Sequence, residues 1–228
     1  MYDYPDYQDA LSTHNIFYPA SDPNVICVGA TAYKTGYYNF DGVWVKDDWG
    51  SGGEVGSYSS RGPTLAGHIK PEVLAPGTNI VAAFNSFYTE MNPDYNTAEY
   101  DVSRYTFRGR DYAWGIMSGT SMACPIVAGI IAQWMEAVPT LTREQVLEVF
   151  EATCHRRNPS LSYPNNDYGY GEIDAEAGLN YLMDVYTGII ETTDNRQRTT
   201  DIYNLAGQKV GEDYKGIVII NGRKELRK

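Results

Sequence analysis

The chain has 228 residues, of which 43% are hydrophobic and 21% are charged, so it is long enough for one sizeable core and too apolar to be disordered. Its net charge of −11 argues against nucleic acid and anionic membrane surfaces as partners. We expect neither a membrane span nor a signal peptide within these residues, because no run of about 18 apolar residues occurs and the N-terminal stretch lacks a basic start and an apolar region.

Two short apolar segments predict strands of a parallel sheet. The run at 24–31 ends in small residues, as expected of a strand that is buried on both faces. Two further strands of the same kind are predicted within 70–84, separated by Pro76 and Gly77. The following stretch, 85–113, is polar and rich in tyrosine, and we interpret it as a long functional loop or an insertion.

Three helices are predicted in the second half of the chain. The stretch 121–137 is apolar nearly all round, which is typical of a helix inside a larger domain. Thr142 and Gln145 form a capping-box signature that starts a second helix, and a third fits 175–185. Strands followed by helices indicate an α/β layered domain.

The charge pattern places a domain boundary near residue 188. Residues 189–228 carry eight basic and six acidic residues, a net charge of +2, which leaves −13 for 1–188. The stretch 192–201 contains no hydrophobic residue and reads as a linker. The short β-type runs that follow, with a hairpin signal at Asn221-Gly222, predict a small antiparallel tail.

Three cysteines, Cys27, Cys124 and Cys154, lie far apart in the chain. They form neither a CxxC pair nor Cys/His ligand spacing, so we predict no zinc site. One disulfide with one free thiol is an open alternative to the three buried thiols that we favour.

A serine at the start of the predicted buried helix is the main candidate for chemistry. In the string WGIMSGTSMACPIVAG, the hydroxyl of Ser121 lies where unpaired backbone N–H groups and the positive end of the helix dipole converge. Gly119 would allow a sharp approach of the backbone. The alternative is that Thr120 or Ser121 only caps the helix. An α/β-hydrolase nucleophile turn needs Gly-x-Ser-x-Gly, and Ala123 replaces its last glycine.

The string GTSMACPIVAG closely resembles the nucleophile motif of subtilisin-like serine peptidases, the subtilases. Segments 18–31, 58–83 and 168–179 resemble further parts of that family and follow in its order. The resemblance covers roughly residues 16–185. It implies the C-terminal part of a three-layer α/β/α domain with a parallel sheet.

The resemblance also implies roles for individual residues. Ser121 would be the nucleophile of an endopeptidase that acts on protein or peptide substrates through an acyl-enzyme, and Gly119 and Thr120 would support its oxyanion hole. Phe17 and Tyr18 stand where the family lines its substrate pocket, although the packing of two aromatic rings explains them equally well. No cofactor is implied; the family often holds calcium, but no acidic cluster here is specific enough to assign one.

The general base that a serine nucleophile needs is missing from the motifs of this chain. Its histidines, His14, His68 and His155, stand outside any His-Gly-Thr context, and no Asp-Ser-Gly, Asp-Thr-Gly or Ser-Ala-Gly-Asn string occurs. We interpret the chain as a fragment whose catalytic Asp and His lie upstream, and which is inactive alone. The alternatives are an inactive subtilase-fold module for binding or adhesion, and recruitment of one of the three histidines as a substitute base.

The tail DIYNLAGQKVGEDYKGIVIINGRKELRK resembles the short C-terminal β modules of proteins that bacteria export by type IX secretion. This resemblance implies the export machinery as a partner and a secreted or cell-surface location. The alternative is an ordinary β appendage that packs on the body of the protein.

Overall fold

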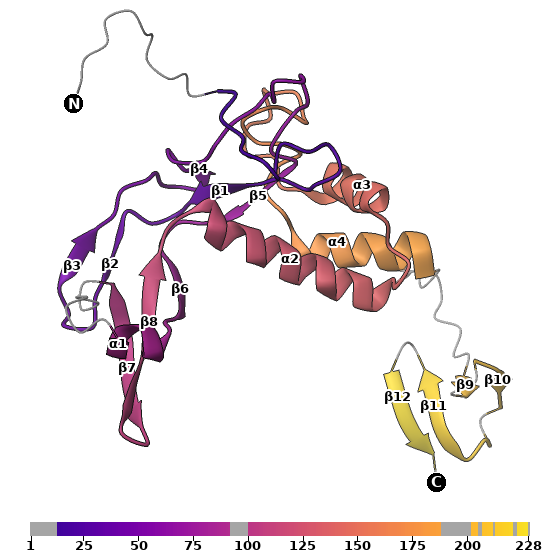
Figure 1. The fold of residues 1–228 in the computed structure, drawn as a ribbon. Helices are drawn as coiled ribbons and strands as arrows, with labels where there is room; N and C mark the ends of the chain where they lie inside the picture. Colours follow the sequence, from indigo (N-terminus) through magenta and orange to yellow (C-terminus); the bar gives the residue numbers. More distant parts are fainter. Residues whose placement is uncertain are drawn as a thin grey trace, which may run out of the picture. The chain divides into compact units, whose positions relative to one another are not determined.

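A computed structural model shows how these segments fold. It describes residues 13–91, 100–187, 202–204, 207–211, 213–220 and 223–227. The chain divides into two compact units, 1–189 and 190–228, each of which is described here by itself (Figure 1). The predicted boundary near residue 188 and the linker at 192–201 lie outside the described residues.

A three-stranded sheet forms the centre of the first unit. Strands β1 (Val28–Ala32) and β5 (Val73–Pro76) pair in parallel, and β4 (Glu54–Val55) pairs antiparallel with the other edge of β1. Ala30 and Ala75 face each other in the register and are fully buried. The prediction of parallel strands within 24–31 and at the start of 70–84 is therefore confirmed.

Three helices build the core on this sheet (Figure 1). They are α2 (Thr120–Ala137), α3 (Arg143–Thr153) and α4 (Ala175–Leu182), and α4 continues into a short π-helical segment, η1 (Met183–Thr187). The rings of Trp134 on α2 and Phe150 on α3 lie 6.1 Å apart and are both buried. This arrangement confirms the α/β class.

The predicted capping box at the start of α3 is present. The Thr142 hydroxyl accepts a hydrogen bond from the Gln145 backbone N–H at 3.3 Å, and the Gln145 side chain accepts one from the Thr142 N–H at 2.8 Å. Both bonds satisfy N–H groups that the helix itself leaves unpaired.

A second, antiparallel sheet extends from the first unit next to the start of α2. Its strands are β6 (Ile80–Ala83), β8 (Arg110–Met117) and β7 (Asp101–Phe107), with β8 in the centre. A short helix, α1 (Ser86–Met91), follows β6. A separate hairpin pairs β2 (Gly36–Tyr38) with β3 (Trp44–Lys46).

Two predictions are wrong in this region. The second strand of 70–84 is β6, which pairs antiparallel with β8 and has no place in the parallel sheet. The stretch 85–113, predicted as a long functional loop or an insertion, is not a loop: it contains α1, all of β7 and part of β8. The hairpin turns at Arg108 and Gly109, both with positive φ (52° and 75°), and this Arg-Gly pair between alternating residues is the signal that could have revealed it.

Helix α2 is less buried than its composition predicts. Ala123, Val127 and Trp134 are buried, but the opposite face is exposed. Most of that face is small and apolar, although Glu136 also lies on it; its small and apolar members are Cys124, Pro125, Ala128, Gly129, Ala132 and Met135. The prediction of three buried thiols is therefore wrong for Cys124, although Cys27 and Cys154 are buried and all three thiols are free.

The second unit is a small antiparallel sheet in the order β10-β9-β11-β12. Its strands are β9 (Ile202–Asn204), β10 (Lys209–Val210), β11 (Gly216–Ile220) and β12 (Arg223–Arg227). Ile220 pairs with Arg223, so β11 and β12 form the predicted hairpin, although its turn residues, 221–222, lie outside the described part. Ile202 and Val218 are buried between the strands.

Candidate active site

Ser121 is the second residue of α2, and its side chain is exposed. Gly119 precedes the helix in an extended conformation (φ 160°, ψ 160°) and, having no side chain, provides no cap. The N-cap position is thus occupied by Gly119, and neither Thr120 nor Ser121 caps the helix. Within the described residues, the Ser121 hydroxyl has no hydrogen-bond partner, so its oxygen faces solvent at the helix start.

The first two backbone N–H groups of α2 are unpaired among the described residues. The N–H of Met122 donates to the Gly119 carbonyl at 3.0 Å, whereas those of Thr120 and Ser121 have no acceptor in the described part of the chain. Such groups add to the positive end of the helix dipole. Unpaired donors at a helix start favour an anionic oxygen there.

The start of α2 is fixed by a backbone contact with the loop after β5. The Gly119 N–H donates to the Gly77 carbonyl at 2.8 Å. A Cβ on Gly77 would lie 2.6 Å from the Ala30 Cβ and 2.8 Å from the Gly119 oxygen, whereas a Cβ on Gly119 would meet nothing closer than 3.6 Å. The close backbone approach expected at Gly119 is therefore present, but the residue that must lack a side chain for it is Gly77.

A polar cluster anchors Ser118, which lies just before α2. The Ser118 hydroxyl donates to a carboxylate oxygen of Asp47 at 3.0 Å and accepts from the Asn79 backbone N–H at 3.0 Å. The Asn79 side-chain amide donates to the Lys34 carbonyl at 3.0 Å. Sequence reasoning missed these residues, because no local motif brings them together.

The two predicted substrate-binding aromatics are almost fully exposed. Phe17 is 86% and Tyr18 81% accessible, on the loop that precedes β1. The alternative of two aromatic rings packing into the fold is therefore not what the structure shows. Within the described residues, no hydrogen bond or ring contact joins Phe17 or Tyr18 to the start of α2.

A buried ion pair holds the loop that carries these aromatics. Lys70, which is 1% exposed, donates to the carbonyls of Asp22 (2.9 Å) and Val25 (2.6 Å) and to the Glu72 carboxylate (2.6 Å). Glu72 also accepts from the Cys27 backbone N–H at 2.7 Å. Burial, with a smaller contribution from Glu72, raises the pKa of the Cys27 thiol to about 12, so this thiol stays neutral.

None of the three histidines is paired with Ser121. His14, His68 and His155 are all exposed, and in the described part none hydrogen-bonds the serine. The His14 ring contacts the Thr13 hydroxyl at 3.0 Å, and the His155 backbone pairs with Glu172. The geometry gives no support to a substitute base.

The described residues contain no group of three or more His, Cys, Asp or Glu side chains placed to hold a metal ion. No described helix has both the length and the apolar character that crossing a bilayer requires.

Comparisons with known proteins identify the family. Residues 8–171 match the model of the Subtilase family, Peptidase_S8. The chain belongs to the subtilases. The recognition from the serine motif is thereby confirmed, and the family is the one that contains Peptidase_S8 proteins.

Curated relatives of this subtilase include the serine protease AprX of Bacillus subtilis (strain 168), which is 36% identical over 127 residues, 54% of this chain and 24% of AprX. The subtilisin-like protease SBT4.6 of Arabidopsis thaliana is 29% identical over 68% of this chain and 20% of its own length. An uncharacterized protein of Aquifex aeolicus (strain VF5), aq_aa18, is 29% identical over 85% of this chain and 76% of its own. The chain thus spans a quarter or less of the two named proteases.

Among solved structures, the CspB protease of Clostridium perfringens superimposes with a TM-score of 0.50 at 24% identity. The match covers 75% of this chain and 30% of CspB. At this identity the likeness supports the fold of the subtilase unit.

Proposed function

We propose that Ser121 is the nucleophile of a subtilase endopeptidase, and that the base and carboxylate that activate it come from polypeptide outside these 228 residues. The observation that carries the proposal is an exposed, unbonded hydroxyl beside the unpaired N–H groups of Thr120 and Ser121. This combination provides an attacking oxygen and an oxyanion site at one helix start.

The reaction follows from this arrangement. The base removes the Ser121 proton as the oxygen attacks a peptide carbonyl, and the carbonyl oxygen becomes an oxyanion that the backbone N–H groups bind. The carbon–nitrogen bond then breaks, the amine leaves with the proton, and water releases the acyl group from Ser121. Each oxyanion donor of this kind contributes roughly 10²–10³-fold to turnover.

The exposed rings of Phe17 and Tyr18 support a role in binding a side chain of the protein or peptide substrate. Two rings this exposed offer apolar area that a ligand would cover. The Lys70–Glu72 pair fixes the loop behind them, which keeps this surface in place for the reaction.

This subtilase chain by itself should be inactive. In subtilisin, loss of the catalytic histidine lowers turnover about two-million-fold, and none of the three histidines here contacts Ser121. The alternative function is a subtilase-fold binding or adhesion module without chemistry, which the exposed apolar face of α2 favours.

A fluorophosphonate probe separates the two functions. The intact gene product that contains these residues is treated with the probe and mapped by peptide mass spectrometry. We expect one adduct, on Ser121, which is absent from the Ser121→Ala variant and from this chain alone. A folded gene product without an adduct on Ser121 would favour the binding module.

We also propose that residues 1–188 are the C-terminal part of the catalytic domain and that 189–228 form a sorting module for the bacterial export machinery, which would place the protein outside the cell or on its surface. The compact antiparallel sheet of β9 to β12 supports a separate tail. Deleting 189–228 from the intact protein should leave it in the periplasm. Unchanged export would refute the sorting role.

A further inference from the structure

We propose that an aromatic pocket beside Ser118 binds a bulky apolar side chain of the peptide substrate, close to the bond that Ser121 attacks. This inference rests on the proposed function. It adds a preference for substrates with a large aromatic or aliphatic residue. Side chains of the β2–β3 hairpin, β8 and the adjacent segments would contact that residue.

The pocket has a volume of about 420 Å³, within the range of sites that take organic ligands. Seven of its ten lining residues are aromatic or aliphatic, and Lys46, Asp47 and Ser118 add polar groups. The lining residues are Tyr37, Val45, Lys46, Asp47, Trp49, Phe84, Tyr100, Ile116, Met117 and Ser118. An apolar wall with a few placed polar groups suits a large side chain whose backbone remains near solvent.

The wall combines rigid and accessible parts. Tyr37 and Ile116 are buried, whereas Trp49, Tyr100 and Met117 are 43%, 41% and 51% exposed and offer area that a ligand would cover. An aromatic or aliphatic guest would remove this surface from water, which is the main source of its affinity.

Polar contacts connect the pocket to the residue that leads into α2. Asp47 lines the pocket and accepts a hydrogen bond from Ser118, the residue that leads into α2. The Asp47 backbone N–H donates to the Thr35 carbonyl at 3.0 Å, which ties the β2–β3 hairpin to the same point. The pocket and the helix start are therefore one connected structure.

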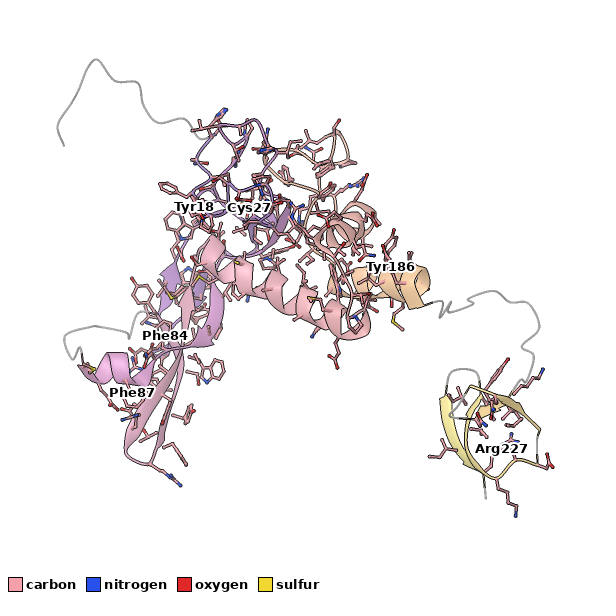
Figure 2. The ribbon with its side chains drawn as sticks, turned by 45° about the vertical axis from the view of Figure 1, so that its right-hand side comes forward. Tyr18, Cys27, Phe84, Phe87, Tyr186 and Arg227 are labelled. Carbon is pink, nitrogen blue, oxygen red and sulfur yellow. The ribbon has the colours of Figure 1, made fainter. Side chains whose placement is uncertain are left out.

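The pocket lies within reach of a substrate bound at Ser121. Ser118 precedes Ser121 by three residues, which span at most about 10 Å of extended chain. In the view of Figure 2, the start of α2 lies between Tyr18 and Phe84, a residue of the pocket wall. A peptide bound at Ser121 would thus have a neighbouring side chain within reach of the pocket.

Family membership alone does not imply this pocket. Tyr37, Trp49, Phe84 and Tyr100 lie between the segments that carry the resemblance to subtilases. They come from the β2–β3 region and from the two ends of the stretch between β6 and β7. The preference is therefore a property of this chain.

Peptide binding tests the pocket without requiring catalysis. The Ser121→Ala variant of the intact gene product is titrated with fluorescein-labelled alanine hexapeptides that carry one Phe at each position in turn, and anisotropy is measured. Burying one Phe ring should tighten binding roughly 10- to 100-fold in one register relative to all-alanine. The fluorophosphonate experiment tests Ser121 separately, so each idea can fail without the other.

Two variants in the pocket and one control outside it test whether the pocket causes the preference for Phe. Trp49→Ala should abolish the preference for Phe, and so should Tyr100→Ser, which guards against a folding defect in one variant. Trp44→Ala should retain it, because Trp44 on β3 is similarly exposed (50% against 43%) but does not line this pocket; it lines a neighbouring one that shares Tyr37 and Ile116. Equal or absent binding of the Phe and alanine peptides, or a preference that survives both pocket variants, would overturn the proposal.

Discussion

Replacing Lys70 by Met tests whether the buried ion pair holds the loop that precedes β1. The substitution keeps an unbranched, apolar stem but removes the ammonium group. The carbonyls of Asp22 and Val25 then lose their donor, and the Glu72 carboxylate loses its partner at 2.6 Å.

The expected cost is large because Glu72 remains buried. It would keep the Cys27 N–H and a longer contact with Arg143 at 3.4 Å, which compensate only in part. Removing one partner of a buried pair costs about 3–5 kcal/mol, against a total stability of about 5–15 kcal/mol for a domain. Neutralising the carboxylate in the double variant Lys70→Met/Glu72→Gln should recover part of this loss, because the amide still accepts from Cys27.

Urea unfolding of the intact protein, followed through the fluorescence of the buried Trp134, measures this cost. Lys46→Met is the matched control: its salt bridge with Asp48 is long (3.5 Å) and its side chain is 72% exposed, so about 0–1 kcal/mol is expected. Limited proteolysis should also cut the loop around Asp22 faster in Lys70→Met. A loss below about 1 kcal/mol for Lys70→Met would contradict the reasoning.

Three further outcomes follow from single residues. In the native chain, iodoacetamide should modify Cys124 well before Cys27 and Cys154, because only Cys124 is exposed; equal rates in a mass-spectrometric time course would be inconsistent with the fold. Burial raises the pKa of the Cys27 and Cys154 thiols from 9.0 to about 12. The stability contributed by the neutral thiols is therefore complete below pH 9 and is lost as the pH rises toward 12. Cys27→Ala should reduce this alkaline loss of stability, measured by urea titrations at about pH 8 and about pH 11. Gly77→Ala should cost about 1–3 kcal/mol by overpacking against Ala30 and should lower fluorophosphonate labelling of Ser121 in the intact protein, whereas normal labelling would show that the helix start tolerates the extra carbon.

Sequence reasoning succeeded where the signal is local. The capping box at Thr142 is a four-residue pattern, and the strands at 28–32 and 73–76 are continuous apolar runs of the kind found in parallel sheets. The placement of Ser121 at the start of a helix likewise depended on a short motif and the apolar run after it.

It failed where the outcome depends on which distant segments pair. Strand β6 has the composition of a buried strand, yet it pairs with β8, and nothing within 80–83 indicates that partner. The apolar composition of α2 shows that the helix can be buried on all sides, but which face is covered depends on its neighbours. The aromatic pocket joins residues from 37 to 118, so it could be found only in the folded chain.

Because of the contact between Gly119 and Gly77, the position of the serine oxygen and the identity of the nearby aromatic residues can change independently in evolution. The serine oxygen is located by a main-chain hydrogen bond and by a position that has no room for a side chain. Neither depends on the identity of the aromatic residues nearby. Mutations in the β2–β3 and β7–β8 hairpins can therefore change the surface near Ser121 while the serine oxygen stays where it is.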